Sequence, residues 1–407
     1  MWGGERDITM ENMNDTSAKC AKCKRPLAAT DRFCKYCGKK VEESSDKFSF
    51  EEKIKEEKVN YKKNGTFSDE KSEEASQSIF DKINDYVGNT GSKELNWKNL
   101  FSDVFKHHTT DEAEEIFICG TKKTTPALSN VSSTWPNPWL YSRVFVIFAI
   151  VFILLKICWE CFNNINVVPG LIMVGSFAVP LTTLILFLEV NAFRNISLYQ
   201  VVKYFLVGGC AALFVTLILY SMFLQPNVYN MTFFDACIIG VVEELAKAII
   251  VFFILKHSIQ YKYILNVLLI GAAVGAGFAA FESAGYAFVV LLNNLANGNA
   301  MEVMLDNIYL RGFMSPGGHV TWAAISASAI LLAKGNKPLE FNLFFSGRFW
   351  KIFIIPVILH ALWDTPIELG HEIYLQYWLL FVAIWVIVLI FINMGLNEVK
   401  QINKSEL

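Results

Sequence analysis

Charge is scarce in this sequence, and it is unevenly spread. Asp, Glu, Lys and Arg make up 18% of the 407 residues, against about 25% in an ordinary soluble domain. The first 30 residues contain no apolar stretch, so we expect no secretory signal peptide. The net charge is −2 and no basic stripe is visible, so we expect no nucleic-acid partner.

Hydrophobic residues are correspondingly abundant: they make up 53% of the chain, which includes 33 Phe. Residues 1–130 are rich in Lys, Glu, Asp and Ser, whereas apolar runs dominate from Val144 onward. This shift predicts a polar N-terminal third followed by a membrane domain. The expected segments are a zinc ribbon (1–45), a charged linker (46–78), a cytosolic juxtamembrane helical segment (79–135), a transmembrane domain (140–395) and a cytosolic tail (396–407).

Four cysteines near the N-terminus form two CxxC knuckles ten residues apart, at Cys20, Cys23, Cys34 and Cys37. Four thiolates in this spacing are typical of tetrahedral zinc coordination, so we expect a structural zinc ribbon. Two disulfides are the alternative, and they would require an oxidising compartment. We expect the ribbon to bind a cytosolic protein partner.

The juxtamembrane segment shows helical spacing of its apolar residues, which predicts two or three short helices within 79–120 that pack together or on the membrane surface. His107 and His108 lie beside Asp111 and Glu112, a set that could bind metal. Solvated residues at a helix end are the interpretation that we prefer.

A membrane-spanning helix needs about 20 apolar residues. Eight candidates meet this requirement, which predicts an all-α polytopic membrane protein with about eight transmembrane helices. They are residues 144–160, 167–190, 201–224, 232–255, 264–292, 307–333, 351–368 and 374–394.

The basic residues predict the orientation. Ten of them lie in one set of connections and the tail: Arg194, Lys203, Lys256, Lys262, Lys334, Lys337, Arg348, Lys351, Lys400 and Lys404. The alternate loops hold none, and Arg311, at the start of the sixth span, is the basic residue nearest to them. The positive-inside rule therefore predicts cytoplasmic N- and C-termini. Lys156, Glu160 and Glu189 lie near span ends and are expected to snorkel.

Ionisable residues inside spans are costly, so each is a functional hypothesis. Three i, i+4 pairs share a helix face: Glu243 (beside Glu244) with Lys247, Glu282 with Tyr286, and His360 with Asp364. His319 follows Pro316-Gly317-Gly318 in the sixth span.

Depth supports a shared site. At ~1.5 Å per residue, Glu243 lies ~17 Å from the outer end of its span, Glu282 ~15 Å, His319 ~18 Å and His360 ~12 Å. Four helices of alternating direction thus place these groups in one layer. Gly and Ala between 271 and 280 leave one side of the fifth span with few side-chain atoms, so neighbouring helices can approach closely. The Pro-Gly-Gly triplet predicts a break in the sixth span, which requires a protein-lined or watery cavity.

Amide hydrolysis needs a base for water, a donor for the oxyanion and an acid for the leaving amine. Glu243 or Glu244 could activate water, and His319 and His360 could bind water, the oxyanion or a metal ion. Neither GxSxG nor HExxH occurs, which argues against serine hydrolases and zincins of the usual type.

These motifs, in this order on successive spans, resemble the PrsW family of bacterial intramembrane proteases, which is related to the CAAX prenyl endopeptidases of the CPBP superfamily. The resemblance covers roughly residues 140–395. It implies a protease of the bacterial cytoplasmic membrane, of glutamic or metal-dependent type, that cleaves a membrane-anchored protein such as an anti-sigma-type regulator. Glu243 and Glu244 would then be the base and its partner, with Glu282 and Asp364 supporting His319 and His360, and Lys247 and Tyr286 in supporting positions.

Other interpretations stay open. The Glu–Lys and His–Asp pairs could only fix helix packing, Glu282 could form a buried hydrogen bond with Tyr286, and Tyr286, Trp322 and Trp363 are expected to pack rather than react. A non-catalytic membrane scaffold or a proton-coupled transporter could also use such groups, although no inverted repeat is visible.

Overall fold

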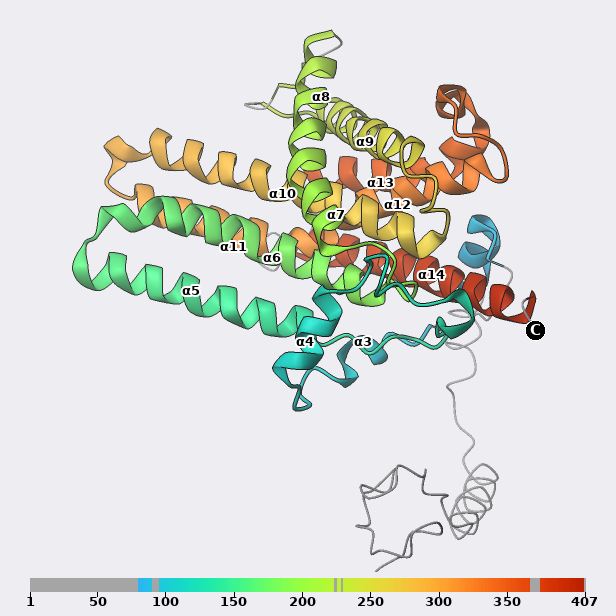
Figure 1. Cartoon of the computed structure of the whole chain (residues 1–407). Coiled ribbons are helices and arrows are strands. Elements are labelled where there is room, and N and C mark those ends of the chain that lie inside the picture. Colours follow the sequence, from blue (N-terminus) through green and yellow to red (C-terminus); the bar gives the residue numbers. More distant parts are fainter. Residues whose placement is uncertain (1–79, 90–94, 223–224, 228–229, 367–373, 406–407) are drawn as a thin grey trace, which may run out of the picture. The chain divides into compact units, whose positions relative to one another are not determined.

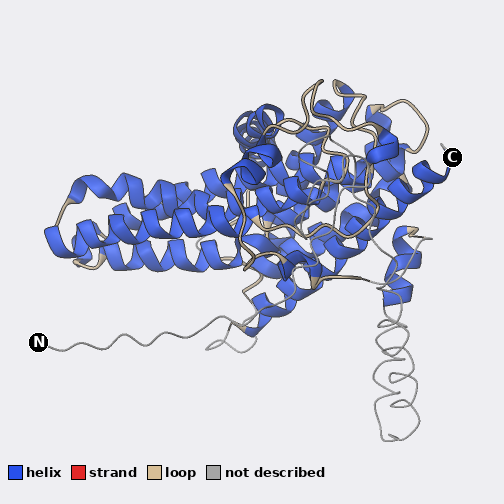
Figure 2. Ribbon diagram, turned by 60° about the horizontal axis from the view of Figure 1, so that its bottom comes forward, coloured by secondary structure: helices blue, strands red, loops and turns tan. Residues whose placement is uncertain are grey.

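The structure is a computed structural model that describes residues 80–89, 95–222, 225–227, 230–366 and 374–405. Within these ranges the chain is helical and contains no β-strand (Figure 2). The fold class is therefore all-α, as predicted. The four ribbon cysteines and the charged linker lie outside the described residues, so both stay predictions.

The helices of the apolar region follow the expected spans closely (Figure 1). They are α5 (Leu140–Phe162), α6 (Val168–Val190), α7 (Leu198–Lys203), the π-helical turn η3 (Tyr204–Gly208), α8 (Gly209–Met222), α9 (Phe233–Lys256), α10 (Ile264–Asn293), α11 (Ala300–Met314), α12 (His319–Lys334), α13 (Gly347–Asp364) and α14 (Leu375–Ser405). The last helix continues through the residues expected to form the tail.

Five helical stretches among the described residues are long and apolar enough to cross a membrane: 140–162, 165–190, 198–222, 264–293 and 375–404. The predicted count of eight is thus not confirmed. The reason is physical: α11 and α12 are too short, and charged side chains interrupt the apolar character of α9 and α13. The ionisable groups that suggest a site are among those that lower the hydropathy of α9 and α13.

The sixth predicted span is broken, as the Pro-Gly-Gly triplet indicated. Helix α11 ends at Met314, a 3-10 turn covers Ser315–Gly317, and α12 begins at His319. Proline lacks a backbone N–H and cannot continue a helix interior. The break places the first turn of α12 beside the core of the protein.

Glu189 does not snorkel, which corrects the expectation for this residue. Its carboxylate accepts hydrogen bonds from the backbone N–H groups of Trp139, Leu140 and Tyr141 at 2.8, 2.9 and 2.9 Å. These amides belong to the first turn of α5, where helical partners are missing. A carboxylate at a helix N-terminus also complements the helix dipole, so Glu189 fixes the start of α5 against α6.

The juxtamembrane segment is tied to the helical region at several points. It contains a helix over 80–87, α3 (Asn99–Ser102), α4 (Thr110–Phe117) and η1 (Leu128–Asn130). The Tyr86 hydroxyl donates to the Lys351 carbonyl of α13 at 2.6 Å, and the Asn403 amide of α14 donates to the Val131 carbonyl at 3.0 Å. This segment therefore packs as part of the helical unit.

His108 has a structural role in that segment. Its ring stacks on Trp139 with centroids 3.8 Å apart, and its Nδ1 lies 3.0 Å from the Glu112 carboxylate. This hydrogen bond is the main reason that the pKa of Glu112 is lowered. The arrangement agrees with a helix-end role rather than a metal site.

Helix α10 is central, and it packs against α6, α8, α11 and α12. Its first half is buried on all sides rather than bald on one side. A Cβ at Gly271 or Gly275 would collide with the backbone of α12, and one at Gly277 would collide with the Phe205 carbonyl of η3. The small residues thus let two neighbours approach α10 closely, on different faces.

Gly275→Ala tests this close packing. The new methyl group would meet the His319 carbonyl and would lie 2.7 Å from the Ala323 Cβ, so α12 must shift. Overpacking of this kind costs about 1–3 kcal/mol, and we expect a lower melting temperature together with a displaced His319. Gly285→Ala on the same helix is the matched control, because no atom lies within 4 Å of its Cβ position. Equal melting temperatures for the two variants would contradict this account.

Candidate active site

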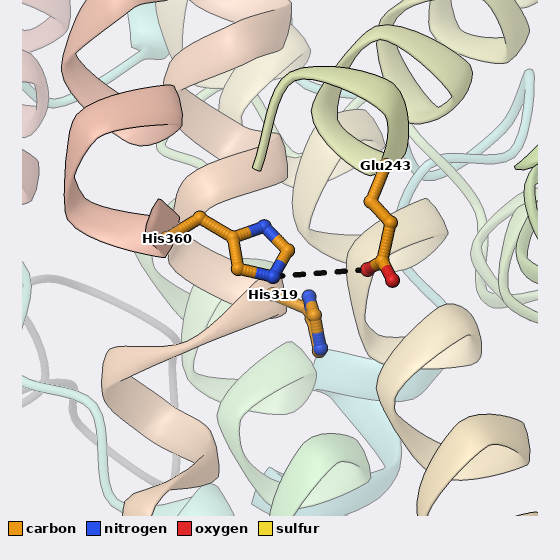
Figure 3. A group of neighbouring side chains, drawn as sticks. All are labelled: Glu243, His319 and His360. Atoms are coloured by element: carbon orange, nitrogen blue, oxygen red, sulfur yellow. Dashed lines mark ion pairs between the residues drawn. The ribbon is translucent and has the colours of Figure 1, made fainter. Parts of the chain in front are cut away.

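The ionisable residues that the sequence places in four separate spans lie together in the structure. Glu243 comes from α9, Glu282 from α10, His319 from the start of α12 and His360 from α13. Figure 3 shows the Glu243 carboxylate directed toward the rings of His319 and His360. The expected convergence of these groups is therefore present.

A capping box fixes the register of α9. The Thr232 side chain accepts from the Asp235 backbone N–H, and the Asp235 carboxylate accepts from the Thr232 N–H. Both groups would otherwise be unpaired at the helix start. Glu243 follows about three turns after the start of the helix, which places its side chain level with the break before α12.

Glu244 and Lys247 form a fully buried ion pair, with Nζ and Oε1 2.7 Å apart. The same carboxylate oxygen lies 3.1 Å from the His360 Nδ1, and the Ser326 hydroxyl donates to the other oxygen at 3.4 Å. Glu244 is thus saturated with partners. Its position suits the support of His360 better than direct contact with a substrate.

Lys247 also approaches His319, with Nζ 2.9 Å from the ring Nδ1. The ammonium group lies 4.1 Å from the Phe278 ring centroid and 3.8 Å from the Glu243 Oε2. An ammonium can only donate, so Nδ1 of His319 accepts and Nε2 carries the proton. That proton points to Glu282, whose Oε2 is 2.9 Å from Nε2.

His360 is buried between carboxylates. Its Nε2 lies 3.2 Å from the Asp364 carboxylate and 3.8 Å from the Glu243 Oε2. Its ring stacks on Trp322, with centroids 4.3 Å apart. Carboxylates on both sides and an aromatic face fix the orientation of this imidazole, and Trp322 packs as expected.

Glu282 meets a residue that sequence reasoning did not include in the site. Arg311 Nη2 lies 2.5 Å from the Glu282 Oε2, and the Arg311 guanidinium covers the Tyr286 ring at 4.5 Å. Tyr286 therefore contacts the cation that pairs with Glu282. One signal could have revealed Arg311: it is the basic residue closest to the set of connecting loops that otherwise contains no basic residue.

Tyr220 is a second site residue that sequence reasoning did not include. Its hydroxyl, on α8, donates to the Glu243 Oε1 at 3.3 Å. A tyrosine in an apolar span gives no spacing signal of its own, and only the packing of α8 on α9 brings it here.

A cavity of about 470 Å³ connects these groups. Its wall contains all four converging side chains, Glu243, Glu282, His319 and His360, together with Asp364 and Arg311. Lys247 and Glu244 lie behind this wall. The cavity provides the protein-lined space that the broken helix requires.

Three cavity side chains are spaced for a metal ion. Glu243, His319 and His360 each offer a ligand atom, and these atoms lie within 4.8 Å of one another. The Glu243 Oε2 is buried without a hydrogen-bond partner among the described residues. Two imidazoles and a carboxylate form a ligand set that suits catalytic zinc, so these residues fit a divalent cation. The contacts of His319 with Lys247 and Glu282 would have to yield for it to bind.

Comparison with known families agrees with this chemistry. Residues 197–392 match the model of a family described as PrsW family intramembrane metalloprotease. The matched region runs from α7 into α14 and includes every site residue named above. This region, just under half of the chain, is thus similar to a family of intramembrane metalloproteases, the family that the motifs resemble. Neither the zinc ribbon nor the relation to CAAX prenyl endopeptidases is part of this match.

Comparison with curated proteins and with solved structures adds no relative. No curated protein and no solved structure matches this chain.

Proposed function

We propose that this protein is an intramembrane endopeptidase that hydrolyses a peptide bond of a membrane-anchored protein, with Glu243, His319 and His360 at its catalytic centre. The convergence of these three side chains on one cavity carries the proposal, together with the buried Glu243 Oε2, which has no hydrogen-bond partner among the described residues. A buried carboxylate oxygen without a hydrogen bond is costly, and costly ionisable groups inside spans are typical of functional sites.

In the proposed reaction, Glu243 accepts a proton from a water molecule as the water oxygen adds to the carbonyl carbon of the scissile bond. The carbon–nitrogen bond then breaks, and Glu243 returns the proton to the leaving nitrogen. Its Oε1 is held by Tyr220, which leaves Oε2 free for this exchange. A carboxylate acting as base and then as acid contributes about 10²–10⁴-fold to rate.

The remaining residues position these groups. Glu244 and Asp364 hold the two nitrogens of His360, while Lys247 and Glu282 hold those of His319. Carboxylates that hydrogen-bond a histidine fix its tautomer and its orientation. Glu244 is thus assigned a supporting role, and Glu243 is assigned the proton transfer.

The family description favours a metal-dependent version of this reaction. Glu243, His319 and His360 would hold the ion, and a bound divalent cation supplies Lewis-acid polarisation of the carbonyl or activation of water. In a glutamic mechanism without metal, Glu243 is not a ligand and acts as the base described above.

Cleavage of a tagged single-span protein by the purified full-length chain in liposomes tests the proposal. New termini within the span or at its outer end are the expected result. Capture of the span without cleavage would instead favour a scaffold, and flux of a small solute without a product would favour a transporter. Either outcome would reject the protease.

We further propose that both termini are cytoplasmic and that cleavage occurs in the outer half of the membrane. Cys161 is exposed at the end of α5 opposite to the basic connections, so a membrane-impermeant maleimide should label it in intact cells. Cys161→Ser should abolish the label, and Lys123→Cys introduced into that Cys161→Ser variant should react only after permeabilisation. Cys119 should stay unlabelled throughout, because burial raises the pKa of its thiol. Labelling of Lys123→Cys in intact cells would reverse the orientation.

The N-terminal cysteines are proposed to bind structural zinc and to recruit a cytosolic partner. Deletion of residues 1–45 should leave cleavage of a minimal reporter intact but change partner capture or the regulation of activity. No change of either kind would reject this role for the ribbon.

A further inference from the structure

Arg311 links the two halves of the broken helix through one carboxylate oxygen. It lies in the last turn of α11, while His319 is the first residue of α12. The Glu282 Oε2 accepts from both, at 2.5 Å from the Arg311 Nη2 and 2.9 Å from the His319 Nε2. The break between the half-helices is therefore bridged by a side chain of α10.

The guanidinium is held on several sides. Its Nε donates to the Ser283 hydroxyl at 2.9 Å, its Nη2 donates to Glu282, and its face covers the Tyr286 ring. Adjacent residues of α10 thus accept from two edges of one planar group. A lysine cannot reproduce this arrangement, because its ammonium is a point donor on a flexible stem.

The consequence concerns His319. Its Nδ1 meets Lys247 and its Nε2 meets Glu282, so Glu282 sets the rotation of the ring that faces the cavity. Without Arg311, the ring of His319 would be the remaining hydrogen-bond partner of the Glu282 carboxylate among the described residues. Arg311 thus gives Glu282 a second partner, which does not depend on the position of the His319 ring.

We propose that Arg311 is a positioning residue, which orients His319 through Glu282 and keeps Glu282 satisfied when His319 engages the substrate. This proposal rests on the protease function proposed above. Arg311 acts on the rate of the chemical step rather than on substrate affinity, because it contacts the supporting carboxylate and not the reacting groups.

The test combines kinetics with a signal that does not depend on cleavage. In the full-length protein, Arg311→Lys should lower kcat about 10-fold and Arg311→Gln about 100-fold, the range found for groups that orient a catalytic ligand, with KM nearly unchanged. Added guanidinium should partly restore Arg311→Ala. Lys156→Gln, which removes a cation at the outer end of α5, is the matched control and should match wild type.

Ring ¹⁵N resonances of His319 supply the second measurement, since the chain has only 6 histidines and His319→Asn assigns the signal. We expect Arg311→Gln to shift these resonances and Lys156→Gln to leave them unchanged. Unshifted resonances, wild-type kcat in Arg311→Gln, or loss of kcat with equal loss of thermal stability and no guanidinium rescue would each overturn the proposal. Absence of cleavage by wild type would instead reject the protease itself, and the positioning role with it.

Discussion

Glu243→Gln should lower the cleavage rate by about 10²–10⁴-fold, the contribution of a positioned general base. Glutamine has the shape of glutamate but cannot accept the proton of the attacking water. The measurement is the initial rate of product formation from the tagged span in liposomes. Glu243 forms only long contacts, 3.3 Å to the Tyr220 hydroxyl and 3.8 Å to Lys247 and His360, so the melting temperature should hardly change.

Glu302→Gln is the control for this result. Glu302 is an exposed glutamate of α11 that borders a different cavity, near the C-terminal end of α5 and the N-terminal end of α11. The Glu302→Gln variant should cleave the tagged span at the wild-type rate. A Glu243→Gln variant with near wild-type rate would remove Glu243 from the chemistry, and attention would pass to Glu282 and Asp364, the other carboxylates that border the cavity.

Glu244→Gln should behave differently, which separates the two adjacent glutamates. Glu244 accepts from Lys247 and His360 in a fully buried position, and removal of one partner of a buried charge pair is strongly destabilising. The same type of substitution one residue along the chain is thus expected to reduce stability rather than chemistry alone.

The sequence predicted much of this site because the spacing within one helix is fixed. The pairs Glu243–Lys247 and His360–Asp364 lie four residues apart and do contact each other. The common depth of four groups depended only on the rise of a helix. These features depend only on residue spacing and on the geometry of a single helix, so they can be derived from the sequence.

Contacts between helices could not be derived in this way. The approach of Lys247 to His319 depends on how closely α9 and α12 pack, and the pairing of Arg311 with Glu282 depends on where the sixth span breaks. The supposed pairing of Glu282 with Tyr286 shows the limit, since Arg311 contacts both residues. Side-chain spacing predicted which groups share a layer, but not which of them are partners across different helices.

The second prediction with a large expected effect concerns the metal content of the purified protein. Purified wild type should contain two equivalents of divalent metal per chain, one in the ribbon and one at the catalytic centre, and His360→Gln should retain one. Glutamine can still donate to Glu244 but is a poor metal ligand compared with imidazole. Elemental analysis of the purified proteins measures this directly, and cleavage should fall together with the lost equivalent.

The controls assign each equivalent to its site. His257→Gln changes an exposed histidine at the end of α9 that contacts the Phe253 carbonyl, so it should retain both equivalents. Cys20→Ser combined with Cys34→Ser should remove only the ribbon metal. If wild type holds a single equivalent and the cysteine variant loses it while still cleaving the span, the catalytic centre works without metal. Glu243 would then activate water without a cation, with His319 and His360 as the expected donors to the carbonyl oxygen.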